Sequence, residues 1–97
     1  MTDDHLQKSL FSPAYTRFLA LFRQARIAAG LTQVEAAKRL GRPQSFVSKC
    51  ESGERRVDVI EFIQFCRVYG VNPSALVEQI ARETRKKPAK ARPGNPP

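Results

Sequence analysis

Three polar side chains near the middle of the chain have the chemistry needed to recognise nucleic-acid bases. Gln44, Ser45 and Lys49 lie on the outward side of a helix expected over residues 44–52. A glutamine amide supplies the donor and the acceptor that bridge adenine N6 and N7, and Lys49 can reach guanine O6 and N7 or a phosphate. We predict base contacts for all three, the alternative for Gln44 being simple hydration.

A second set of residues is suited to binding phosphates. Gln33 stands at an expected helix start, where free backbone N–H groups and the positive end of the helix dipole attract anions. Phosphate contacts fix register and supply salt-sensitive affinity without specifying sequence. We predict such contacts for Gln33, Arg42, Ser48, Arg55 and Arg56. Ordinary solvated loop charges are the alternative for the last two.

Two short helices joined by a tight turn must position these side chains. Thr32 and Glu35 have the spacing of a capping box, which predicts a helix over 33–40. Gly41 can adopt the left-handed conformation that ends this helix and lets the chain turn. The second helix then covers about 44–52.

Three further helices and two flanking segments complete the predicted organisation. Ser12-Pro13, Asp58 with Glu61, and Asn72-Pro73 are helix-start signals. We expect an all-α domain over 13–84 with helices at about 13–29, 33–40, 44–52, 59–69 and 73–84. A flexible arm is expected over 1–12, and a disordered, proline-rich basic tail over 85–97.

The helix expected over 59–69 is so apolar that its side chains cannot all face one core. The residues expected to pack inward are Ile63 and Cys66, with Val59 and Ile60 or Phe62. Those left over, which we expect to be exposed or buried in an interface, are Phe65 and Tyr69.

The segment 32–53, TQVEAAKRLGRPQSFVSKCESG, resembles the helix-turn-helix of the Cro and C1 phage-repressor type, also called the XRE family of bacterial regulators. The resemblance depends on Gln33, on Ala37 where the two helices cross, on Gly41 in the turn, on inward Val47 and on the closing ESGERR. It extends over about 18–80. It implies a five-helix, lambda-repressor-like domain that binds double-stranded DNA.

The same resemblance implies roles for individual residues. Gln44 occupies the most frequent base-reading position, and Gln33 would hold a phosphate while bracing the first residue of the recognition helix. Arg26 and Glu51 correspond to an internal ion pair that ties the first helix to the end of the recognition helix. A bidentate guanidinium–carboxylate pair would fix the angle between these helices, so we assign both residues a structural role.

Two departures from the family pattern concern the recognition helix. Arg42-Pro43 stands where an apolar residue and a Ser or Thr cap are common, so this helix would begin without a side-chain cap. Cys50 replaces a larger aliphatic residue, which leaves looser packing or a space filled by Phe46. Packing on the domain is favoured for Phe46 over contact with a thymine methyl group.

Composition narrows the classes of function. The net charge of +8 is concentrated in 38–56 and 82–97, which suits a polyanion on one face. Two cysteines and one histidine do not form a metal site, and buried reduced thiols are favoured for Cys50 and Cys66. Catalytic pairs, phosphate loops and carboxylate clusters are not evident, so we expect no enzyme and no cofactor. The sequence shows no membrane span or signal peptide, and a cytoplasmic protein is expected.

The leading hypothesis is a sequence-specific transcriptional regulator, a repressor that reads the major groove with 44–52 as a homodimer. The dimer interface is expected on the helices over 59–69 and 73–84. One alternative is an antitoxin or restriction–modification controller that represses its own operon and has a protein partner. Another is a protein-interaction module, which the joint presence of the predicted DNA-contacting residues argues against.

Overall fold

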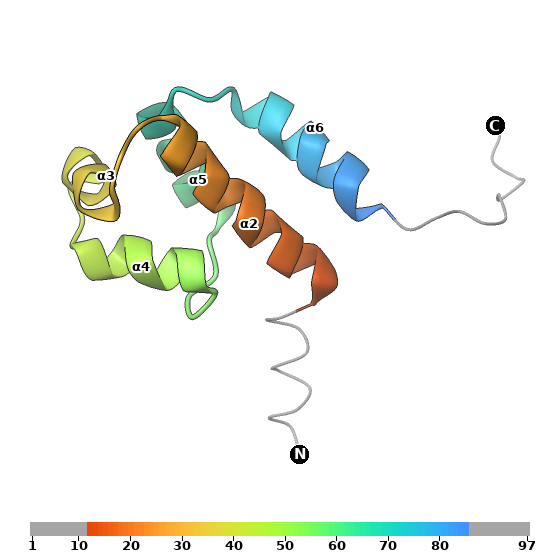
Figure 1. Ribbon diagram of the computed structural model, residues 1–97, viewed down its shortest axis with the longest axis horizontal. Coiled ribbons are helices and arrows are strands. Elements are labelled where there is room, and N and C mark those ends of the chain that lie inside the picture. Colours follow the sequence, from red (N-terminus) through yellow and green to blue (C-terminus); the bar gives the residue numbers. More distant parts are fainter. Residues whose placement is uncertain (1–11, 86–97) are drawn as a thin grey trace, which may run out of the picture.

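The computed structural model describes residues 12–85, which form five helices and no strand. The helices are α2 (Pro13–Ala28), α3 (Gln33–Leu40), α4 (Gln44–Ser52), α5 (Val59–Tyr69) and α6 (Pro73–Thr84). Figure 1 shows α3 and α4 at one end of the molecule and α6 lying along α2. The predicted all-α helix-turn-helix fold is confirmed. Except for Ser12 and Arg85, the arm and tail expected at 1–12 and 85–97 lie outside the described residues.

Reciprocal hydrogen bonds fix the starts of α3 and α5. The Thr32 hydroxyl accepts from the Glu35 backbone N–H at 3.0 Å, and the Glu35 carboxylate accepts from the Thr32 N–H at 2.9 Å. Asp58 and Glu61 repeat this capping box at 2.8 and 3.0 Å. Each box satisfies backbone donors that a helix leaves without intrahelical partners. These caps therefore determine where the two helices begin.

The turn between α3 and α4 depends on Gly41. Its φ is 72°, a left-handed conformation that a residue with a Cβ adopts only with strain. The Arg42 N–H donates to the Ala37 carbonyl at 3.0 Å, which closes the end of α3. Pro43 then precedes α4 in an extended conformation without a side-chain cap. The chain can thus change direction within a few residues, so that α4 packs across α3.

The inner face of α4 packs into the main core. Val47 and Cys50 are fully buried beside Ala36 of α3. The rings of Phe22 and Phe65 meet edge to face below them, with centroids 4.7 Å apart. Such packing holds α4 on one side and leaves its polar side facing solvent.

Helix α5 is buried differently from the expectation. Phe65 and Tyr69, which the sequence placed on a surface or in an interface, are only 0% and 7% exposed, so that prediction is wrong. They pack in the cluster formed with α3 and α4, whereas Phe62 and Cys66 pack in a second cluster with Leu76 of α6. Because α5 lies between two packed clusters, it buries residues around much of its circumference.

The burial expected for the first turn of α5 is also partly wrong. Val59 was expected inward, yet it is 67% exposed. Of the two alternatives for the inward set, Phe62 is buried and Ile60 is 60% exposed. Val59 borders two open hollows that α5 shares with α6, so its apolar side chain is left uncovered there.

Candidate nucleic-acid interface

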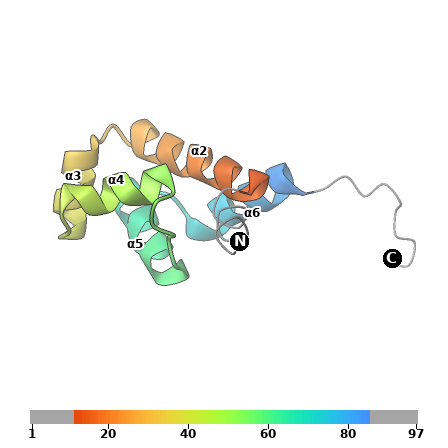
Figure 2. The same cartoon turned by 90° about the horizontal axis from the view of Figure 1, so that it is seen from below.

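The solvent-facing side of α4 presents the three side chains predicted to contact bases. Gln44, Ser45 and Lys49 are all exposed, and Ser48 between them is half-buried. Figure 2 shows α4 nearest the viewer at this end of the molecule, with α2 above it and α5 below it. The structure therefore gathers these polar groups on one accessible surface.

A chain of hydrogen bonds connects the first residue of α4 to the protein interior. Gln44 Nε2 donates to Gln33 Oε1 at 2.8 Å, and Gln33 Nε2 donates to Glu51 Oε1 at 2.9 Å. A carboxylate can only accept, so Glu51 fixes which end of the Gln33 amide faces it. The Gln33 oxygen must then face Gln44, which in turn fixes the amide of Gln44. Gln33 thus braces Gln44 in the free protein.

The chain ends in a buried ion pair between α2 and α4. Arg26 Nε and Nη2 donate to the two Glu51 oxygens at 2.6 and 3.0 Å, and Nη1 donates to the Leu31 carbonyl at 2.9 Å. The two side chains are only 10% and 4% exposed. The hydrogen bonds with Glu51 raise the pKa of Arg26 above its ordinary value. The pair therefore joins α2 to the last turn of α4.

The loop arginine Arg55 forms a second bidentate pair, which the sequence did not indicate. Its Nη1 and Nη2 donate to the Glu61 oxygens at 2.8 and 2.9 Å. These bonds hold the pKa of Glu61 below its usual value. The Arg55 side chain is still 42% exposed, so N–H groups outside the pair remain near the surface. The capping-box spacing revealed one role of Glu61 but not this one.

Phe46 packs between two arginines and the core. Its ring stacks on Phe65 with centroids 5.8 Å apart, in line with the packing favoured from the sequence. The guanidinium of Arg42 lies 3.9 Å from the Phe46 ring centroid, and that of Arg55 lies 4.9 Å from it. Cation–π contacts of this kind orient both arginines beside the start of α4.

Arg56 and the loop around it are held by α2. The guanidinium of Arg56 lies 4.2 Å from the centroid of the Tyr15 ring. The Tyr15 hydroxyl also accepts a hydrogen bond from the Val57 N–H at 3.2 Å. Tyr15 thus positions a loop predicted to contact phosphate, a role that the sequence did not indicate.

A polar hollow of about 230 Å³ lies on the α2 side of α4. Gln33, Ser48 and Glu51 line it together with Arg23, a residue that the sequence pattern did not indicate. Arg23 is exposed and comes from α2, one turn before the buried Arg26. Two predicted phosphate-binding side chains therefore share a site with an additional guanidinium.

The described residues 12–85 show no group of three His, Cys, Asp or Glu side chains that could hold a metal ion. Both cysteines are buried free thiols, and burial raises the pKa of each. None of the helices described is long and apolar enough to cross a membrane.

Taken with the fold, the exposed polar side of α4 and the α3–α4 turn define a helix-turn-helix domain of the DNA-binding class. A helix-turn-helix domain family model matches residues 17–85, and the chain belongs to that family. It is also similar to a solved structure, an XRE-family like protein from Pseudomonas syringae pv. tomato str. DC3000, with a TM-score of 0.73. The two are 52% identical over 81% of this chain and 96% of the other. A search of curated proteins gives no match. The protein is an XRE-type helix-turn-helix regulator.

Proposed function

We propose that this protein is a transcriptional repressor that binds a specific double-stranded DNA sequence through α4. The observation that carries the proposal is the hydrogen-bond chain from Arg26 through Glu51 and Gln33 to Gln44. One N–H of the Gln44 amide is used by Gln33. The other N–H and the oxygen remain, and these are the donor and acceptor that adenine requires in the major groove.

The remaining polar residues divide into base and phosphate contacts. Ser45 and Lys49 share the exposed side of α4 with Gln44 and are proposed to contact bases. The proposed phosphate contacts surround them on α3, on the α3–α4 turn, on α4 and in the following loop: Gln33, Arg42, Ser48, Arg55 and Arg56. Although Arg55 is paired with Glu61, a guanidinium has five N–H donors and can bind a phosphate at the same time.

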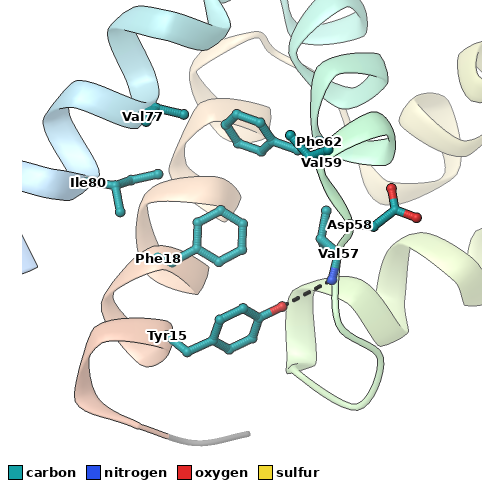
Figure 3. A pocket seen from close by; sticks show the side chains of 8 residues that line it. All are labelled: Tyr15, Phe18, Val57, Asp58, Val59, Phe62, Val77 and Ile80. Carbon is teal, nitrogen blue, oxygen red and sulfur yellow. Dashed lines mark hydrogen bonds between the residues drawn. The ribbon is translucent and has the colours of Figure 1, made fainter. Parts of the chain in front are cut away.

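We also propose that the protein acts as a homodimer, through an apolar surface on α5 and α6. A hollow of about 300 Å³ lies between α2, α5 and α6. Figure 3 shows Phe18, Phe62 and Val77 pointing into it. Val59 and Val77 line both this hollow and a neighbouring one, and Val77 is 51% exposed. An apolar surface of this kind on a small domain suits a protein contact. A two-fold dimer would place two recognition helices about 34–36 Å apart, one turn of DNA.

Selection of bound sequences from a random duplex pool tests sequence-specific binding. We expect an enriched palindrome whose half-sites are about one helical turn apart. Recovery of the input distribution would contradict sequence-specific binding. A reporter promoter that contains the enriched site should have lower output when the protein is present, and a higher output would contradict repression.

Sedimentation at micromolar concentration tests the dimer. Val77→Glu should shift the protein to monomer, because a carboxylate would be buried in the apolar contact. Ile27→Glu is the matched control, since Ile27 is 47% exposed on α2 but does not line the hollow. A wild-type protein that stays monomeric with and without DNA would contradict the homodimer.

A further inference from the structure

Three arginines from three different segments meet at a hollow beside the α3–α4 turn. Arg39 comes from the last turn of α3, Arg42 from the turn itself and Arg67 from the last turn of α5, with Gln64 nearby. The hollow is shallow and has a volume of about 440 Å³. All four of these side chains belong to exposed residues. Guanidinium and amide N–H groups thus surround one small accessible space.

The positive charge of this hollow is only partly offset. In the described part of the chain, no acidic residue lines it. Glu35 lies on α3 near Arg39, and Glu61 lies 3.8 Å from Arg42 but already holds another arginine in a closer pair. The Arg67 side chain makes no ion pair with any described residue. An oxyanion would therefore meet guanidinium groups whose positive charge is only partly compensated there.

The position of the hollow relates it to the proposed DNA-binding surface. Gln33 and Arg23 lie beside the start of α3, and Arg39 and Arg67 lie beside its end. Figure 2 shows that α2 and α5, which supply the two outer arginines, lie on opposite sides of α4. Helix α3 has 8 residues, so its two ends are separated by roughly 12 Å. The major groove between the two DNA backbones is also about 12 Å wide.

We propose that this hollow binds a backbone phosphate on the DNA strand that lies across the major groove from the strand contacted at Gln33. With α4 in the groove, α3 spans it, and each end of α3 meets one backbone. Gln33 and Arg23 serve one strand, and Arg39, Arg42 and Arg67 serve the other. This inference rests on the proposed DNA binding and adds Arg39 and Arg67 as binding residues.

A simpler role exists for the same arginines. Cations in the last turn of a helix stabilise it through the helix dipole, and Arg39 and Arg67 both occupy such positions. That role predicts a change in stability and no change in DNA binding. The phosphate contact predicts a change in the salt dependence of DNA binding. The two roles can therefore be separated by measuring both quantities on the same variants.

The test uses the full chain with Arg39→Gln and Arg67→Gln combined. Arg82→Gln is the matched control, because Arg82 is an exposed last-turn arginine on α6, which packs on α2 and α5. Binding to the selected duplex is measured from low to high salt, and thermal unfolding is followed in parallel. We expect the double variant to reduce the slope of log affinity against log salt by ~1 without altering base preference. The control should keep the wild-type slope.

Phosphate ethylation interference gives an independent readout. In the wild type, ethylation on each of the two strands flanking the groove should weaken binding. In the double variant, interference should weaken within each half-site at the phosphate assigned to the hollow, and it should persist at the phosphate that meets Gln33 on the opposite strand. An unchanged slope and unchanged interference in a protein that still selects a sequence would overturn this inference and leave the proposed function standing. A wild-type protein that selects no duplex would overturn both.

Discussion

Two bidentate arginine–glutamate pairs lie at the end of the molecule formed by α3 and α4, and the exposure of their arginines differs sharply. The Arg26 and Glu51 side chains are 10% and 4% exposed, whereas Arg55 is 42% exposed beside an 11% exposed Glu61. The first pair is buried between helices, whereas in the second pair the arginine is exposed beside the proposed phosphate contacts and the glutamate is buried. The same type of interaction thus fixes α4 against α2 in one place and, in another, positions an arginine that remains accessible to solvent.

The largest expected effect comes from breaking the buried pair. Glu51→Ala leaves the Arg26 guanidinium buried without a counter-charge, so we expect the free energy of unfolding to fall by about 3–5 kcal/mol. Urea denaturation measures this loss. Glu83→Ala is the control, because Glu83 pairs with Arg17 at the exposed surface. Equal losses of unfolding free energy from the two variants would show that burial does not make the Arg26–Glu51 pair more important than the Arg17–Glu83 pair.

The next largest effect is expected from removing the side chain of Gln44, which the Arg26–Glu51 pair orients through Gln33. Gln44→Ala should weaken binding to the preferred duplex by roughly 1–3 kcal/mol and relax selection at one base position. Competition binding against single-base variants of the site measures both effects. Gln24→Ala, an exposed glutamine on α2, should change neither. A loss by the same factor on preferred and random duplexes would contradict the base contact.

A smaller effect, equal on all duplexes, is expected for the loop after α4, which the Arg55–Glu61 pair helps to hold. Arg56→Ala should weaken binding to all duplexes equally and lower the slope of log affinity against log salt by ~1. Salt titrations on the preferred and a random duplex provide the measurement. Arg55→Ala should lower the slope as well, and it should also reduce stability because Glu61 loses its partner. A loss confined to the preferred duplex would assign Arg56 to base recognition instead.

The smallest expected effect is a loss of stability at acid pH, caused by protonation of Glu61 in its pair with Arg55. The pKa of Glu61 is below its ordinary value of 4.5, chiefly because of the Arg55 hydrogen bonds. Its stabilisation is therefore complete above the unfolded-state pKa and is lost as pH falls through the lower folded-state pKa. Denaturation at pH values below 4.5 should show wild-type stability falling towards that of Glu61→Gln. In an Arg55→Gln background this pH-dependent difference should shrink.

The fold was predictable because its signals are local. Thr32 with Glu35 and Asp58 with Glu61 mark helix starts by side-chain chemistry that acts within three residues. The burial of Phe65 and Tyr69 was not predictable in the same way. It depends on α5 being packed between two clusters, a fact about the whole domain that the periodicity of one helix does not contain.

In the candidate site, too, local features were predictable from the sequence and contacts between distant segments were not. The outward polar residues of α4 follow from helical spacing. The partners of the arginines do not, because Glu61 and Tyr15 reach the loop from α5 and from the distant start of α2. Sequence separation gives no indication of such contacts. The side chains that hold the proposed phosphate contacts are therefore less visible in the sequence than the contacts themselves.

With the base contact proposed for Gln44, its hydrogen bond to Gln33 limits how the protein could acquire a new target sequence. Replacing Gln44 alone would leave the Gln33 oxygen without its donor and the new side chain without its brace. Substitutions at two such coupled positions have effects that do not add. We therefore expect that a change of DNA target, in evolution or by design, requires substitutions at both Gln33 and Gln44.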